Sequence, residues 1–123
     1  MKKVLVLDDN SEVLLLIQIL LDRYGFLVES VTHASLLEKK IQQFEHGLLI
    51  IDVNLEDGDG RIICRDLKAD SSTSHIPIIL FSADPSIATN LKDYCADYFI
   101  TKPIDAKIFV EHVNQFFNRT LVI

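Results

Sequence analysis

The stretch of the chain that most limits its fold is Leu48–Ile51, four branched apolar residues in a row, followed directly by Asp52. No polar residue alternates with them, as it would in a strand with one face in water. An unbroken apolar run is typical of a strand that is buried on both faces of a parallel sheet. Because open α/β sheets bind ligands at the carboxyl ends of their strands, we expect Asp52 to stand at the rim of a binding crevice.

A second apolar run, Val4–Leu7, also ends in carboxylates, at Asp8 and Asp9. Hydrophobic periodicity and turn residues predict strands at 4–7, 26–31, 48–52, 76–81 and 97–101, and helices at 11–24, 35–44, 62–67, 86–95 and 104–117. Parallel strands need right-handed crossovers, so the alternation predicts a doubly wound α/β sheet with helices on both faces. We expect the strand order 2-1-3-4-5, a known order of such sheets that places strands 1 and 3 side by side.

That order brings Asp8, Asp9 and Asp52 into one crevice, where their charges would repel one another. A divalent cation removes the conflict, and Mg²⁺ prefers oxygen ligands of this kind. A carboxylate can also attack phosphorus and form an aspartyl-phosphate. Lys102 follows strand 5 and would neutralise a transferring phosphoryl group, while Ser82 follows strand 4 and offers a hydroxyl to a phosphoryl oxygen. The strand ends together therefore predict a phosphoryl-transfer site.

Each of these residues has a simpler interpretation when it is taken alone. An aspartate or serine after a strand is commonly a turn or helix-cap residue, and a single lysine is commonly solvated. The combination at four strand ends favours the shared site. The loop after Asp52 also resembles the start of a calcium loop, but its sixth position is Asp57 instead of glycine and its twelfth is Ile63 instead of glutamate.

Length and composition restrict the class of protein. The 123 residues suit a single domain, 1–123, and the formal net charge of -6 argues against direct nucleic-acid binding. After two lysines only four apolar residues precede Asp8, too few for a signal peptide or a membrane span. Cys64 and Cys95 fall in helix-like segments and are interpreted as free, buried or half-buried thiols. These features predict a cytoplasmic protein that does not associate with membranes.

The ordered motifs Leu7-Asp8-Asp9, Asp52 after an apolar run, Asp59-Gly60, Ser82-Ala83 and Thr101-Lys102-Pro103 resemble the receiver domain of the two-component response-regulator family over the whole chain. The resemblance implies a flavodoxin-like (βα)5 fold. It makes Asp52 the phosphoacceptor, Lys102 the phosphate-binding lysine, and Ser82 and Phe99 the switch pair. It assigns Mg²⁺, with Mn²⁺ as a substitute, to Asp8, Asp9, Asp52 and the backbone carbonyl of Asn54, and it implies a cis bond between Lys102 and Pro103.

The chain departs from the family pattern at three positions. Glu56 replaces the proline that is usual four residues after the phosphoacceptor, and Asp57 adds a further acid beside it. Cys95 stands where many receivers have glycine. None of these changes removes a catalytic group, but the two acids alter the charge of the loop and with it the expected lifetime of the phosphoryl group.

The first helix carries more apolar residues than one core-facing stripe needs. Its core face is predicted to be Val13, Leu16, Ile17, Leu20 and Tyr24. The surplus is explained by extra core coverage or by isolated exposed leucines. Alternatively, as the family implies, the helix docks on the phosphoryl donor; the residues predicted for this contact are Val13, Leu14, Ile17, Pro103 and Ile104.

The predicted function is acceptance of a phosphoryl group from a histidine of a sensor histidine kinase or histidine phosphotransfer protein, which switches the surface of helix 4, strand 5 and helix 5. Such a protein catalyses its own phosphorylation and dephosphorylation but acts as a switch, and it could form a homodimer on phosphorylation. The main alternative is a receiver-like interaction scaffold that never uses phosphate; the intact polar set disfavours it. A flavodoxin-like cofactor binder would need a phosphate-binding loop after strand 1, and this chain has none there. An aspartyl-phosphate hydrolase would need a second aspartate two positions after its nucleophile, a position that Asn10 holds if Asp8 is the nucleophile.

Overall fold

Five parallel strands form the central sheet of the computed structural model, which describes residues 2–43, 45 and 47–118. They are β1 (Lys3–Leu7), β2 (Leu27–Val31), β3 (Leu48–Asp52), β6 (Ile78–Ser82) and β7 (Tyr98–Thr101). Their order in the sheet is β2-β1-β3-β6-β7. Since β6 and β7 are the fourth and fifth strands of this sheet along the chain, the predicted order 2-1-3-4-5 is confirmed.

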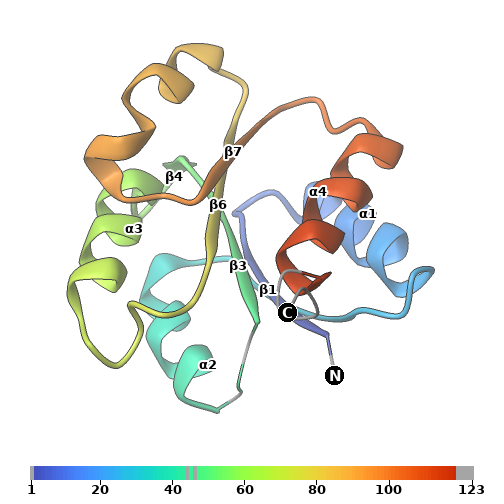
Figure 1. Cartoon of the computed structure of the whole chain (residues 1–123), viewed down its shortest axis with the longest axis horizontal. Helices are drawn as coiled ribbons and strands as arrows, with labels where there is room; N and C mark the ends of the chain where they lie inside the picture. Colours follow the sequence, from blue (N-terminus) through green and yellow to red (C-terminus); the bar gives the residue numbers. More distant parts are fainter. Residues whose placement is uncertain (1, 44, 46, 119–123) are drawn as a thin grey trace.

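Helices cover both faces of the sheet, as predicted for a doubly wound fold (Figure 1). The helical elements are α1 (Ser11–Asp22), η1 (Ala34–Leu36), α2 (Leu37–Gln43), α3 (Gly60–Ala69), η2 (Pro85–Tyr94) and α4 (Ala106–Asn118). One apolar cluster joins α1 and α4 to one face of the sheet, and a second joins α2, α3 and η2 to the other. The right-handed crossovers of a parallel sheet require this split between two layers.

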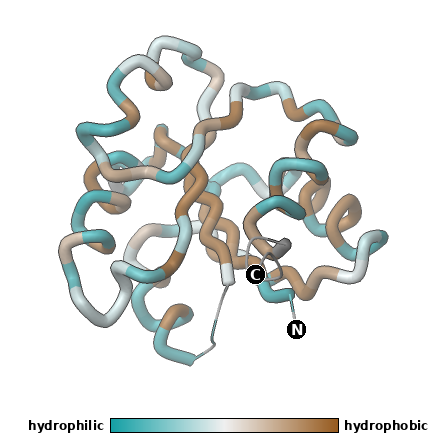
Figure 2. Tube along the Cα trace, in the orientation of Figure 1, coloured by the Kyte–Doolittle hydropathy of each residue, from teal (hydrophilic) through white to brown (hydrophobic). Residues whose placement is uncertain are grey.

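The core lies along the strands. All five residues of β3 and all five of β6 are buried, and the apolar strands run between the two helix layers in Figure 2. Cys64 is part of this core, and its burial raises the pKa of the thiol to about 12. Cys95 is free but exposed, so the prediction that it is buried or half-buried is wrong. It ends η2 with a left-handed backbone, φ 60°, which explains why a glycine is common there.

The helix α1 starts at the cap residue Asn10, whose side chain accepts hydrogen bonds from the backbone N–H groups of Glu12 and Val13. Its buried residues are Leu14, Ile17 and Leu21. The predicted core face is therefore wrong at Leu16 and Tyr24, which are 46% and 58% exposed. Consecutive apolar residues from 13 to 17 fit more than one helical face, so periodicity alone does not fix the rotation of this helix.

Several elements differ from the sequence-based expectation. The loop after Asp52 contains a short antiparallel hairpin, β4 (Asn54–Leu55) with β5 (Gly58–Asp59). The helix predicted at 86–95 is the 3₁₀ helix η2, which has a kink at Asn90. The second predicted helix begins as the 3₁₀ turn η1 and continues as α2 to Gln43. Its predicted end at Phe44 lies outside the described residues, as does His46 of the following turn. No helix within residues 2–43, 45 and 47–118 is long and apolar enough to cross a membrane.

Candidate functional site

The two carboxylates that follow β1 meet the carboxylate that ends β3. The parallel register places Leu7 beside Ile51, so Asp8 and Asp52 leave neighbouring strands at the same edge. Carboxylate oxygens of Asp8, Asp9 and Asp52 all lie within 4.8 Å of one another. Asp8 and Asp52 are buried and Asp9 is half-buried. The structure thus brings together the three acids that the sequence placed in one crevice.

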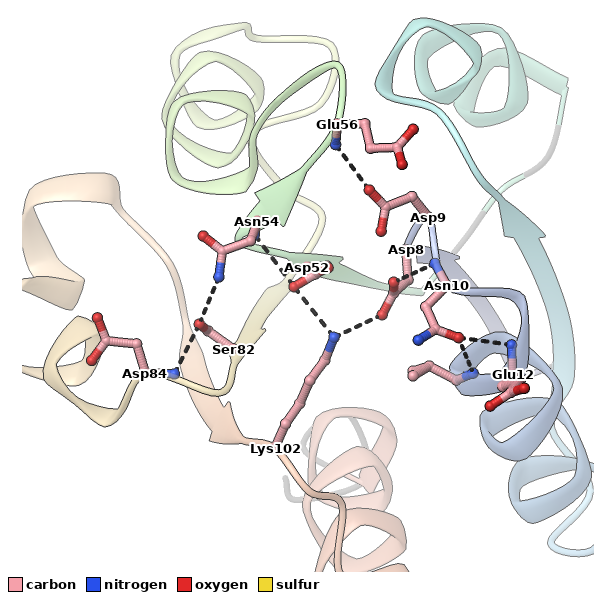
Figure 3. A network of polar contacts seen from close by, with 11 residues as sticks. Asp8, Asp9, Asn10, Glu12, Asp52, Asn54, Glu56, Ser82, Asp84 and Lys102 are labelled. Carbon is pink, nitrogen blue, oxygen red and sulfur yellow. Dashed lines mark hydrogen bonds and ion pairs between the residues drawn. The ribbon is translucent and has the colours of Figure 1, made fainter.

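Lys102 projects from the end of β7 between two of these acids (Figure 3). Its ammonium group lies 3.0 Å from a carboxylate oxygen of Asp8 and 3.5 Å from one of Asp52. It also lies 4.6 Å from the centre of the Phe81 ring, which adds a cation–π contact. The peptide bond between Lys102 and Pro103 is cis, as expected. The lysine therefore supplies the positive charge that the sequence assigned to this crevice.

The carboxyl group of Asp52 loses its proton less readily than an exposed aspartate does. Its burial, together with the negative charge of Asp8, raises its pKa from 3.8 to about 6. The ammonium group of Lys102 and the backbone N–H of Asn54, which lies 3.4 Å from the carboxylate, lower the pKa again in part. A further positive charge in the crevice would favour the ionised form. Only that form is a nucleophile.

The donor set suits Mg²⁺. Three carboxylates come together at the end of the sheet. Carboxylate oxygens are the hard ligands that Mg²⁺ prefers, and the ion usually binds waters and phosphate oxygens besides them. The single positive charge of Lys102 does not balance the negative charges of three carboxylates. The backbone carbonyl of Asn54, the fourth ligand implied by the family resemblance, belongs to the residue that starts β4, two positions after Asp52.

Ser82 lies on the side of Asp52 away from Asp8, and two hydrogen-bond donors hold its hydroxyl group. The side-chain amide of Asn54 and the backbone N–H of Asp84 both donate to its hydroxyl oxygen, at 3.3 and 3.1 Å. The residue is 1% exposed and belongs to β6, next to β3. Figure 3 shows Asn54 joined to both residues, by its side-chain amide to Ser82 and by its backbone N–H to Asp52. The sequence predicted the hydroxyl but not the amide, because Asn54 was considered for its backbone carbonyl alone.

The hairpin after Asp52 is tied to the acids and to the second helix. The backbone N–H of Glu56 donates to the carboxylate of Asp9 at 2.9 Å. The carboxylate of Asp57 accepts from the backbone N–H groups of Ala34 and Ser35 at 3.0 and 3.3 Å. These bonds lower the pKa of Asp57. Glu56 and Asp57, the two acids that depart from the family pattern, thus lie in a hairpin that is bonded to Asp9 of the site and to the start of η1.

Gly60 allows the hairpin to turn back against the end of β3. A Cβ atom at this position would overlap the backbone carbonyl group of Asp52. The N–H of Gly60 donates to the carbonyl of Val53 at 2.9 Å, and the side chain of Asp59 caps α3 by accepting from the N–H of Arg61 at 2.9 Å. The Asp59-Gly60 motif therefore positions the backbone around Asp52.

The remaining predicted site residues divide into two groups. Phe99 is half-buried and packs against the cluster on the α2–α3 face. Val13, Pro103 and Ile104 line one recess of about 330 Å³, together with Leu16, Ala83 and Lys102. Leu14 and Ile17 are buried, 7% and 0% exposed, so the prediction that a partner contacts them is wrong: they face the sheet. The large hydrophobic residues that α1 exposes are instead Leu15, Leu16 and Ile19.

Comparison with known proteins places this geometry in a family. The model of the response regulator receiver domain matches residues 4–114. The chain is 27% identical to the DNA-binding dual master transcriptional regulator RpaA of Synechocystis, over 98% of this chain and 51% of that protein. It thus spans about half the length of this relative.

Solved structures show the same fold. The signal receiver domain of a histidine kinase from Syntrophus aciditrophicus has a TM-score of 0.89 and 25% identity, covering 100% of this chain and 95% of that chain. The response regulator TrrA of Thermotoga maritima, solved with Mg²⁺ and BeF, has a TM-score of 0.85 and 22% identity, covering 94% and 99%. With a family match across most of its length, the chain belongs to the response regulator receiver domain family.

Proposed function

We propose that this protein takes a phosphoryl group from a phosphohistidine onto Asp52 in a Mg²⁺-dependent reaction and thereby switches a signalling surface. The observation that supports it most is the convergence of Asp8, Asp9, Asp52 and Lys102 on one point. Receiver domains as a family are phosphorylated by histidine kinases and bind Mg²⁺ at an acidic pocket. Binding of Mg²⁺ and BeF by the structural neighbour TrrA agrees with the assignment.

In the proposed reaction a carboxylate oxygen of Asp52 forms a bond to phosphorus while the bond from phosphorus to the donor imidazole breaks, and the imidazole leaves with the bonding electron pair. Lys102 neutralises the negative charge of the transferring group from the side of Asp8. Mg²⁺, when it is bound by the three acids, would offset further negative charge on the phosphoryl oxygens. Ser82, already held near Asn54, donates its hydroxyl proton to the new phosphoryl group.

The donor protein is proposed to dock on the recess beside Lys102. Its lining by Val13, Leu16, Pro103 and Ile104 is largely apolar and opens next to the reacting lysine. Leu15 and Ile19 extend the apolar surface along α1, being 59% and 47% exposed. An apolar patch next to a charged site suits a helical partner that carries the phosphohistidine.

The proposal is tested by incubating the protein with acetyl phosphate and Mg²⁺ and treating the product with hydroxylamine. An acyl phosphate on Asp52 is cleaved by hydroxylamine and leaves a hydroxamate at that residue, which peptide mass spectrometry locates. A phosphoryl group on a serine or threonine would survive the treatment and would contradict the proposal. The alternative of a scaffold that never uses phosphate predicts no modification in any arm.

A further inference from the structure

A groove separates α2 from α3 on the face of the sheet that α1 and α4 do not cover. In Figure 1 the two helices lie on the same side of the strands, α2 in teal and α3 in green. The groove has a volume of about 280 Å³. Its apolar lining comes from Leu37 and Ile41 on one wall and from Ile63 and Leu67 on the other. Each pair is four positions apart, so each wall presents one helical stripe.

The rim of the groove is acidic. Glu38 lies on the α2 side and Asp66 and Asp70 on the α3 side, and all three are exposed. No lysine or arginine is among the described residues that line it. Asp70 is fixed by its own loop, because its carboxylate accepts hydrogen bonds from the N–H and the hydroxyl of Ser72 at 2.9 and 2.8 Å. The groove therefore joins an apolar floor to a negatively charged rim.

The lining of the groove, with one apolar stripe from each helix, is of the kind that a third helix can pack against. Two parallel crossover helices, each with apolar residues at i and i+4, leave a furrow between their side-chain ridges into which the ridge of another helix packs. Helix-in-groove recognition uses anchors at i, i+3, i+4 and i+7 of the bound segment. The three rim carboxylates add a preference for positive charge on the flanks of that segment.

We infer that the α2–α3 groove is a docking site for an amphipathic helix of a partner protein, with apolar residues on one face and lysine or arginine beside them. This surface lies across the sheet from the α1 recess proposed for the phosphoryl donor, so the inference goes beyond the proposed function. The two sites can be occupied at the same time. The groove is also connected to the hairpin that follows Asp52, because the carboxylate of Asp57 accepts a hydrogen bond from the N–H of Ala34, another lining residue.

The test uses the full ¹⁵N-labelled chain and two synthetic helical peptides of about five turns, one of leucine and lysine and one of leucine and glutamate with the same apolar pattern. We expect the lysine peptide to shift the amide signals of α2 and α3 and the glutamate peptide to leave them in place. Binding should weaken with added NaCl, because the rim charges are exposed. Shifts confined to the face of α1 and α4, or equal binding of both peptides, would overturn the inference.

A matched pair of charge reversals separates local recognition from attraction to an acidic protein. Asp66→Lys alters the rim, and Glu111→Lys makes the same change in net charge on α4, where Glu111 is exposed on the other layer. We expect Asp66→Lys to raise the dissociation constant of the lysine peptide at least ~5-fold and Glu111→Lys to change it less than ~2-fold. Equal weakening by both variants would show that only net charge matters, and the docking site would be rejected. Neither variant touches Asp52, so the outcome is independent of phosphorylation.

Discussion

The ammonium group of Lys102 lies nearer to Asp8, at 3.0 Å, than to Asp52, at 3.5 Å. Asp8 is 0% exposed, and 94 positions separate it from Lys102 along the chain. A buried carboxylate needs partners, and those of Asp8 are the ammonium group of Lys102 and the backbone N–H of Asn10, which donates at 2.8 Å. We therefore propose two consecutive roles for Lys102, as the counter-ion of the acids before phosphoryl transfer and as a phosphate ligand during it.

Replacing Lys102 should therefore harm the metal-free protein most. In the presence of a chelator we expect Lys102→Met to lower the free energy of unfolding by about 1–3 kcal/mol, because it leaves buried carboxylates without a counter-ion. Added Mg²⁺ should reduce the difference, since it supplies positive charge at the same point. Urea denaturation with and without Mg²⁺ measures both effects. Lys107→Met removes an exposed lysine of α4 and serves as the control; an equal loss in both variants would argue against the counter-ion role.

Asp52 should make stability depend on pH. Its folded-state pKa of about 6 lies above the ordinary 3.8, so between these values the native protein binds more protons than the unfolded chain. Its contribution is fully present below about pH 4 and is lost as the pH rises through about 6. Without metal, Asp52→Asn should be more stable than the wild type by about 1–3 kcal/mol at neutral pH and nearly equal to it in acid. Chelator-containing urea titrations across this range test the sign, and a constant difference between the two proteins would contradict it.

The positions of the site residues could be predicted because unbroken apolar runs identify buried strands. Asp52 and Ser82 end β3 and β6, and Asp8 and Lys102 directly follow β1 and β7. Each of these strands contains or borders such a run, and parallel topology brings their ends together. What lies between the strands was less predictable. The hairpin at Asn54 depends on a close approach between Gly60 and Asp52, a tertiary contact with no local signature.

The rotation of α1 was unpredictable for a different reason. Its consecutive apolar residues satisfy several helical faces, and only packing against the sheet selects Leu14 and Ile17 for the core. This leaves Leu16 exposed, where sequence reasoning expected it to be buried. The surface that we propose for docking on this helix consequently differs from the predicted one by one or two positions, although Pro103 lines the recess beside it.

The corrected surface gives a sharper test of donor docking. Leu16→Glu places a charge in the proposed contact, so phosphoryl transfer from a phosphohistidine protein should slow by about tenfold or more, while transfer from acetyl phosphate should stay at the wild-type rate. Leu36→Glu changes another exposed hydrophobic residue, 48% exposed in η1, and should affect neither donor. The docking assignment fails if Leu16→Glu slows both donors equally or if Leu36→Glu matches it.

Ser82 should pass the modification on to Phe99. Phosphorylation puts about -1.5 to -2 charges at Asp52, and the Ser82 hydroxyl can turn toward them, which would leave space for the aromatic ring on the neighbouring strand β7. We expect Ser82→Ala still to be phosphorylated but to show much smaller NMR shift changes over η2 and β7. Full wild-type shift changes in the variant would mean that Phe99 is a fixed core residue with no part in a switch.

The central claim, that Asp52 alone accepts a phosphoryl group with the help of Mg²⁺, is tested most directly by intact-mass measurement. The wild-type chain and Asp52→Asn are each incubated with phosphoramidate, with Mg²⁺ or with a chelator. We predict that the wild type gains the mass of one phosphoryl group only with Mg²⁺. Asp52→Asn should not be phosphorylated at the wild-type rate, either with Mg²⁺ or with the chelator. Phosphorylation of Asp52→Asn at the wild-type rate, or of the wild type equally well in the chelator, would contradict the account.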